Sequence, residues 1–190
     1  RRPDLEVFAA KHGLKIGSIA DLIRYRLETE QTVKRVHEED VTTDFGAFHL
    51  VVYRDALRGE LHFALTRGVL TDAAPVLCRV HVRNTLSDVL HLHRDELGAT
   101  VSSALQRIAE ADRGVLLVLA GDDTAQAVLA RLGRQPTVPA AGAAQQRAWR
   151  ELGVGAQMLA DLGVCRLRVM GTPRNFVGLA GFGLEVVDYV

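Results

Sequence analysis

The side chains of this sequence best suited to chemistry gather in residues 79–105, where imidazoles and carboxylates lie close together in the chain. The titratable candidates there are His81, His91, His93, Asp88, Asp95 and Glu96. Zinc accepts both imidazole nitrogen and carboxylate oxygen, and catalytic zinc sites often use three such ligands plus a water. A histidine-rich polar segment is more often a solvated loop, however. A metal site built from His81, His91 and His93 is therefore the lesser hypothesis, and we expect no bound metal.

The amino-acid composition indicates what kind of protein carries these residues. The chain has 190 residues, 48% of them hydrophobic, which is typical of a packed globular domain. Lys and Arg number 23 and Asp and Glu number 23, so nothing favours nucleic acid or an anionic membrane surface as a partner. Apolar runs such as 114–121 are too short to span a bilayer. We expect a cytoplasmic protein.

The two cysteines, Cys78 and Cys165, both lie in apolar, strand-like segments. We predict that both are buried free thiols, because a buried cysteine behaves as a small hydrophobic residue and disulfides are rare in the cytosol. Neither a disulfide nor a thiolate metal site is expected from them.

Hydrophobic periodicity predicts a mixed α/β fold, with helices flanking a largely buried sheet and a short helical segment in front. Residues 32–43, 45–54, 60–66 and 75–80 alternate as strands, with short connections that favour an antiparallel meander. The later elements predicted are a helix at 98–111, a strand at 114–119, helices at 124–132 and 145–162, and a strand at 165–170.

Residues 1–31 carry a set of specific motifs: Arg-x-Pro-Asp-Leu, Phe-Ala-x-x-His-Gly-Leu-Lys-Ile and Ile-Ala-Asp-Leu-Ile-x-Tyr-Arg. They resemble the end of the 3,4-dihydroxy-2-butanone-4-phosphate synthase domain. The resemblance implies that 1–31 is the C-terminal tail and linker of such a domain, whose catalytic part lies upstream in the same chain. His12 is then a structural or solvent-facing residue.

A second set of residues with specific spacing comprises Arg79, His81, Asp88, Arg94 and Gly98. These residues are in register with the zinc-binding segment of GTP cyclohydrolase II, which residues 32–190 resemble. The resemblance implies a zinc- and magnesium-dependent enzyme of riboflavin synthesis from a dimeric family. The three zinc cysteines of the family are replaced by Asn84, Asp95 and Leu97, which supply no thiolate.

Other positions of the family's nucleotide site also differ. Thr124 replaces the loop arginine and follows Asp122 and Asp123, whose charge opposes a triphosphate. We interpret one of these two aspartates as the N-cap of the helix at 124–132. Met170 and Asn175 replace the threonine and lysine that contact the nucleotide in the family.

Arg150 occupies the position of the family's proposed nucleophile, but Ala148 replaces its base. An arginine reacts as a nucleophile only if a base removes its proton, since its pKa exceeds ~12. Arg150 is therefore interpreted as a packing or ion-pair residue, with an anion contact as the minority alternative. The resemblance leaves Arg79, His81 and Arg150 as the remnant of a ligand site and implies no catalytic residue.

The resulting hypothesis is a degenerate GTP cyclohydrolase II-like domain, without cofactor, that supports or regulates a fused synthase and forms a homodimer. One alternative is an active cyclohydrolase or phosphate-ester hydrolase with a rebuilt histidine and aspartate metal site. Another is a non-catalytic sensor that binds a nucleotide or flavin-pathway metabolite.

Overall fold

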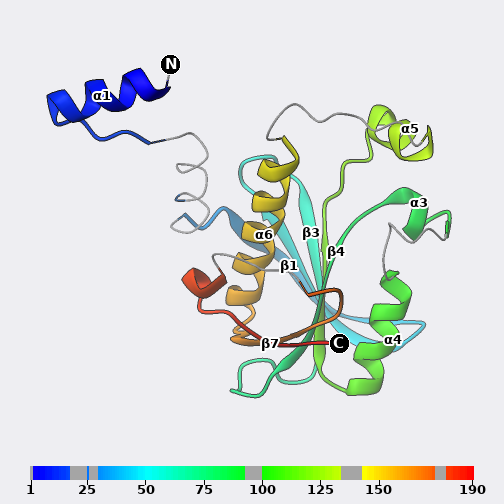
Figure 1. Ribbon diagram of the computed structural model, residues 1–190. Helices are drawn as coiled ribbons and strands as arrows, with labels where there is room; N and C mark the ends of the chain where they lie inside the picture. Colours follow the sequence, from blue (N-terminus) through cyan, green and yellow to red (C-terminus); the bar gives the residue numbers. More distant parts are fainter. Residues whose placement is uncertain (1, 18–24, 26–29, 93–99, 134–142, 174–178) are drawn as a thin grey trace.

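A seven-stranded mixed sheet forms the centre of the protein (Figure 1). The computed structural model describes residues 2–17, 25, 30–92, 100–133, 143–173 and 179–190. The helices are α1 (Arg2–His12), α3 (Thr85–Asp88), α4 (Val101–Ala111), α5 (Ala125–Gly133), α6 (Ala143–Asp161) and the 3-10 turn η2 (Leu179–Phe182). The strands are β1 (Val33–Thr43), β2 (Gly46–Asp55), β3 (Leu61–Arg67), β4 (Val76–Val82), β5 (Gly114–Leu119), β6 (Arg166–Val169) and β7 (Glu185–Tyr189). The predicted α/β class is confirmed.

The strand order is β1-β2-β3-β5-β4-β6-β7. The first three strands form the antiparallel meander that the sequence predicts. The fourth does not continue it, because β5 lies between β3 and β4 and runs parallel to β4. A parallel pair needs a long crossover, and the segment between β4 and β5, which contains α4, supplies it. The predicted meander of three or four strands therefore comprises three, and β4 is not part of it.

Two helices cover opposite faces of this sheet, α6 on one and α4 on the other (Figure 1). Strand β5 serves both sides: Val115, Leu117 and Leu119 pack on the α6 side, and Leu116 packs on the α4 side. An uninterrupted apolar strand is what burial on both faces requires. Met158 and Ile108, from α6 and α4, are fully buried against the two faces.

The N-terminal helix α1, the short helical segment predicted in front of the sheet, ends at His12. Its apolar residues are only partly buried, since Ala9 is buried whereas Leu5 and Phe8 are exposed. His12 is exposed and packs its ring on Phe8, with 4.4 Å between the ring centroids. Residues 18–24 and 26–29 of the predicted helical segment lie outside the described residues.

The two cysteines differ in burial, so one prediction was wrong. Cys78 is buried in β4, whereas Cys165 is exposed. Val164 fills the core next to it, and in extended backbone the following side chain points the other way. In the part of the chain that the structure describes, no helix has the length and apolar character needed to cross a bilayer.

Candidate functional site

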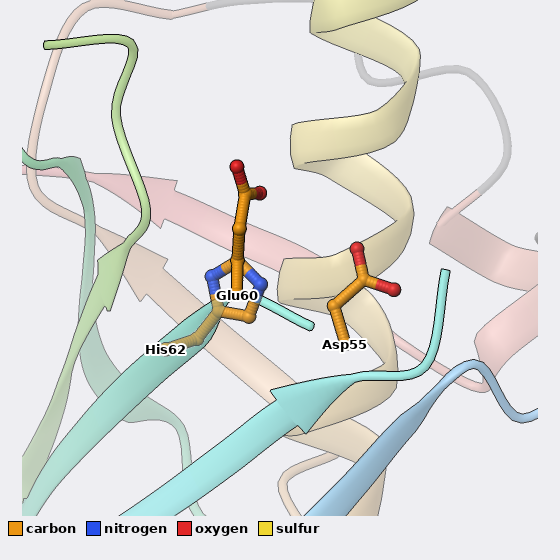
Figure 2. Close-up of side chains that lie close together, drawn as sticks. All are labelled: Asp55, Glu60 and His62. Carbon is orange, nitrogen blue, oxygen red and sulfur yellow. The ribbon is translucent and has the colours of Figure 1, made fainter. Parts of the chain in front are cut away.

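The turn between β2 and β3 brings two carboxylates and an imidazole together: Asp55, Glu60 and His62 (Figure 2). Asp55 ends β2, and its Oδ1 accepts a hydrogen bond of 2.7 Å from the backbone N–H of Leu57. Its carbonyl accepts from the N–H of Gly59, whose φ of +70° suits glycine, and its N–H donates to the carbonyl of Glu60. The turn is thus closed by hydrogen bonds on both sides.

All three side chains lie on the sheet face that α6 covers. Tyr53 and His62 are paired across the β2–β3 ladder, and side chains two apart in a strand share a face. At the end of the hairpin, Asp55 therefore lies on the same face as Tyr53, and Glu60 lies on the same face as His62. One ligand atom from each of the three lies within 4.8 Å of the others. We call this group the hairpin triad.

His62 is the most constrained member of the hairpin triad. It is 4% exposed, and its Nδ1 accepts a hydrogen bond of 3.0 Å from the backbone N–H of Ala120, just after β5. Its Nε2 is buried and has no hydrogen-bond partner among the described residues. Burial lowers the pKa of His62, although the charges of Asp55 and Glu60 act in the opposite direction. The neutral imidazole is therefore favoured at neutral pH.

The hairpin triad forms one side of a pocket with a volume of about 250 Å³. The other side comes from the loop after β5 and from α6, at the carboxyl end of a parallel strand pair, a common ligand position in α/β sheets. The charged and polar residues that line it are Asp55, Arg58, Glu60, His62, Asp122, Asp123, Thr124, Arg150 and Glu151. Five carboxylates face two guanidinium groups, so the pocket disfavours anions.

The loop after β5 is fixed by its own hydrogen bonds. Thr124 caps α5, because its Oγ1 accepts from the N–H of Ala127, and Asp122 accepts from both the N–H and the hydroxyl of Thr124. The prediction that an aspartate is the N-cap was therefore wrong, since the hydroxyl of Thr124 is the group that reaches the helix. Asp123 instead accepts from the N–H of Thr85 and lies 3.6 Å from Arg131.

Of the three predicted ligand-site remnants, Arg150 lines the pocket, whereas Arg79 and His81 are not among its lining residues. The guanidinium of Arg79 donates a hydrogen bond of 2.8 Å to the carbonyl of Met170. His81 is 5% exposed and its Nε2 lies 2.8 Å from Asp88 Oδ2. The structure therefore does not bring the three together in one pocket.

Asp88 is the anchor of the segment around His81. Burial raises its pKa, but hydrogen bonds from the N–H of Asn84, from His81 and from the hydroxyl of Ser87 outweigh burial and lower it. Asn84, which the resemblance aligns with a zinc cysteine, accepts a hydrogen bond from the N–H of Leu86 and caps α3. His91 is exposed, and His93, Asp95 and Leu97 lie outside the described residues.

The hairpin triad was not predicted from the sequence, although the sequence contains a pattern that indicates it. Asp55 and Glu60 stand at the two ends of the predicted turn, and His62 falls on the buried face that includes Ala64. A short hairpin brings the ends of its two strands together, so Asp55 and Glu60 are expected to lie next to each other. The partner of His62, the N–H of Ala120, comes from a strand that the predicted meander did not place beside β3.

Comparisons with known proteins identify a family and several relatives of this chain. The family profile described as GTP cyclohydrolase II matches residues 19–190. A protein of Pseudomonas syringae pv. tomato named 3,4-dihydroxy-2-butanone 4-phosphate synthase is 43% identical over 192 residues, covering 100% of this chain and 52% of the relative. The riboflavin biosynthesis protein RibBA of Aquifex aeolicus is 38% identical over 200 residues, covering 100% of this chain and 49% of the relative.

A solved structure is also similar over the whole chain. It is described as RibBX, a two domain 3,4-dihydroxy-2-butanone 4-phosphate synthase from A. baumannii, with a TM-score of 0.70 and 36% identity. The match covers 100% of this chain and 49% of that protein. This chain therefore spans about half the length of these relatives.

Proposed function

This chain belongs to the GTP cyclohydrolase II family, and from that premise we propose that it is a non-catalytic domain of riboflavin biosynthesis. It supports or regulates a 3,4-dihydroxy-2-butanone 4-phosphate synthase domain that precedes it in the same polypeptide. In this proposal residues 1–31 are the tail and linker of the synthase, and 32–190 form the cyclohydrolase-like domain.

The observation that carries the proposal is the number and placement of the cysteines. The family resemblance implies three thiolates on zinc, and the full sequence holds two cysteines, Cys78 and Cys165. Cys78 is enclosed in β4, and burial raises the pKa of its thiol to about 12, so the thiolate does not form at neutral pH. Asn84, at the first of the three cysteine positions, is a helix cap. Zinc therefore lacks its thiolate ligands, and the family's activated water is lost with them.

The pocket supports the same conclusion by its charge. Asp122, Asp123 and Glu151 line the region where the resemblance places the nucleotide. A triphosphate there would meet like charge in a partly enclosed space, where repulsion is stronger than in bulk water. Arg58 and Arg150 supply two positive charges, whereas the carboxylates that line the pocket supply five negative charges. Binding of GTP is therefore disfavoured.

A rebuilt metal site is less well supported than loss of the metal. The group of possible metal ligands found among the described residues is the hairpin triad, which includes neither His81 nor His91. His81 already uses its Nε2 in the contact with Asp88. We therefore propose no cofactor for this domain.

The names and lengths of the relatives support the regulatory role. Relatives of twice its length carry the synthase name, and the similar solved structure is described as a two domain synthase. A domain that keeps its core without the family's chemistry is expected to contribute stability or control to its neighbour. We propose a cytoplasmic location, a homodimer, and no nucleic acid or membrane partner.

The deciding experiment has two arms on the same preparation. Purified protein is assayed for GTP ring-opening with zinc and magnesium present, and its metal content is measured. We expect no turnover and no stoichiometric metal. Synthase activity and thermal stability of the full-length polypeptide are then compared with those of the synthase domain alone, and we expect the domain to change at least one of them. GTP turnover, or a synthase indifferent to the domain in both measurements, would refute the proposal.

A further inference from the structure

The buried imidazole of His62 has one unused polar atom, and that atom faces acidic neighbours. Its Nε2 is enclosed and has no hydrogen-bond partner among the described residues. Figure 2 shows one ring nitrogen turned toward Asp55, with the side chain of Glu60 beside the ring. All three residues line the pocket. Leaving a buried polar atom unpaired costs about 1–3 kcal/mol, so the arrangement favours a ligand that supplies the missing contact.

The contact with Ala120 indicates which nitrogen of the neutral His62 ring carries the hydrogen. The N–H of Ala120 donates to Nδ1, so Nδ1 carries a lone pair and no hydrogen. In the neutral imidazole the hydrogen then resides on Nε2, which is a donor and offers no lone pair. A metal bound at Nε2 would need the opposite tautomer, and the Nδ1 hydrogen would then point at the N–H of Ala120. Although the three residue types suit a metal, the tautomer argues against one.

The same donor and acceptor pattern excludes other classes of ligand. An ammonium group would pair with Asp55 and Glu60 but could accept nothing from Nε2–H. A phosphate or carboxylate would accept from Nε2–H but would be repelled by the two carboxylates. A hydroxyl group does both, because it accepts from one side and donates to the other.

We propose that the hairpin triad is a binding site for a neutral, polyhydroxylated ligand, of the sugar or alditol class. One hydroxyl accepts from His62 Nε2–H and donates to the carboxylate of Asp55. A neighbouring hydroxyl donates to Glu60. Carboxylates commonly bind ribose hydroxyls in this manner in dinucleotide-binding folds. Nothing in this inference depends on whether the domain regulates a synthase.

The size and the remaining lining of the pocket agree with a small ligand. Its volume of about 250 Å³ lies below the ~300–1,000 Å³ typical of drug-sized ligand sites. Water offers the same donors and acceptors as a hydroxyl, so each ligand hydroxyl gains little over the water that it displaces. We therefore expect dissociation constants on the order of millimolar for single small polyols.

The test is an NMR titration of the isotopically labelled 190-residue chain. The probes are xylitol, D-ribose and myo-inositol, with Mn²⁺, spermidine and inorganic phosphate as representatives of the excluded classes. The readouts are the amide resonance of Ala120 and the Nε2–H resonance of His62. We expect saturable shifts of both with at least one polyol, and no saturable binding of spermidine or phosphate there.

A matched pair of variants localises the contact. Glu60→Gln keeps the side-chain size but removes the charged acceptor, and it should weaken polyol binding by roughly tenfold. Glu151→Gln removes a carboxylate from the α6 side of the same pocket and should change the affinity by less than about twofold. Amide spectra confirm that both variants fold. If no polyol perturbs His62, or if Glu60→Gln binds as well as the parent, the proposal is wrong. Stoichiometric broadening of the Ala120 and His62 signals by Mn²⁺ would show instead that the site takes a metal.

Discussion

Asp161, at the end of α6, links the helix to the sheet through two side chains. Its Oδ2 accepts a hydrogen bond of 2.6 Å from the hydroxyl of Tyr53 and one of 2.8 Å from the guanidinium of Arg35. Burial alone would raise the pKa of Asp161, but these two hydrogen bonds outweigh it, so the pKa lies below its ordinary value. Burial and Asp161 together raise the pKa of Tyr53.

The first prediction concerns the pH dependence of this contact. Because the folded-state pKa of Asp161 is depressed, its contribution to stability is complete above the unfolded value of about 3.9 and is lost as pH falls below it. Asp161→Asn should lower the free energy of unfolding at pH 7 by about 1–3 kcal/mol and flatten the decline between pH 4 and pH 2. Urea unfolding at several pH values measures both.

A matched control for this prediction is Asp188→Asn in β7, which removes an exposed ion pair with Arg168 of β6. Exposed pairs contribute little, so we expect a change of less than about 1 kcal/mol. If Asp161→Asn changed neither the stability nor its acid dependence more than Asp188→Asn does, the role given to the Tyr53 and Arg35 contacts would be contradicted.

The second prediction separates the two cysteines. Cys165 is exposed, whereas Cys78 is enclosed and the pKa of its thiol is raised to about 12. Thiol reactivity follows the thiolate and its access to reagent, so Cys165 should react promptly with a disulfide reagent and Cys78 only after denaturation. Counting thiols in native protein and in guanidinium checks this, and Cys165→Ser identifies the reactive one. Rapid native reaction of both thiols would show that β4 opens readily.

The loop that follows β5 lies very close to the loop that follows β4, and this close approach controls the shape of the pocket. A Cβ at Gly121 would lie 1.7 Å from the carbonyl oxygen of Arg83, which is backbone and cannot rotate away. The two loops approach this closely because β4 and β5 are parallel neighbours, so both loops leave the same edge of the sheet. The absence of a side chain at residue 121 therefore sets the position of Asp122 and Asp123 in the pocket lining.

The third prediction tests this close approach. Gly121→Ala forces the two loops apart and should destabilise the protein by about 1–3 kcal/mol, the usual cost of overpacking. Gly133→Ala is the control, because a Cβ there meets nothing within 4 Å, and its effect should stay within about 0.5 kcal/mol. Thermal unfolding compares the two. Equal midpoints for both variants would mean that the loops can separate without cost.

Across the whole molecule, two apolar cores share one sheet. The core on the α6 side and the core on the α4 side are separated by β5, whose alternate side chains enter one or the other. If β5 left the sheet, apolar side chains of both cores would be exposed. The two cores should therefore unfold together.

The fourth prediction follows from that shared strand. Ile108→Ala on α4 and Met158→Ala on α6 each remove a fully buried side chain and should each cost about 2–5 kcal/mol. Both variants should still unfold in one transition, with coincident loss of far-UV circular dichroism and of buried-tyrosine signal. Two separate transitions in either variant would show that the faces are independent units.

The amino-acid sequence by itself determined the fold class, most element positions and the number of cysteines. Hydrophobic period and turn residues are local, so α1, the β1–β3 meander, α4, β5 and α6 could be predicted from runs of neighbouring residues. The cysteine count is likewise a property of composition and needs no coordinates.

Only the tertiary structure decided which distant residues meet. The pairing of β5 with β3 brings the N–H of Ala120 to His62, a contact between residues 58 positions apart. That single hydrogen bond leaves the hydrogen of the neutral imidazole on Nε2, the donor on which the proposed polyol site relies. Arg150 lines the pocket whereas Arg79 and His81 are not among its lining residues, and this separation depends on strand order. Strand order depends on how long-range surfaces pack, and local patterns carry little information about it.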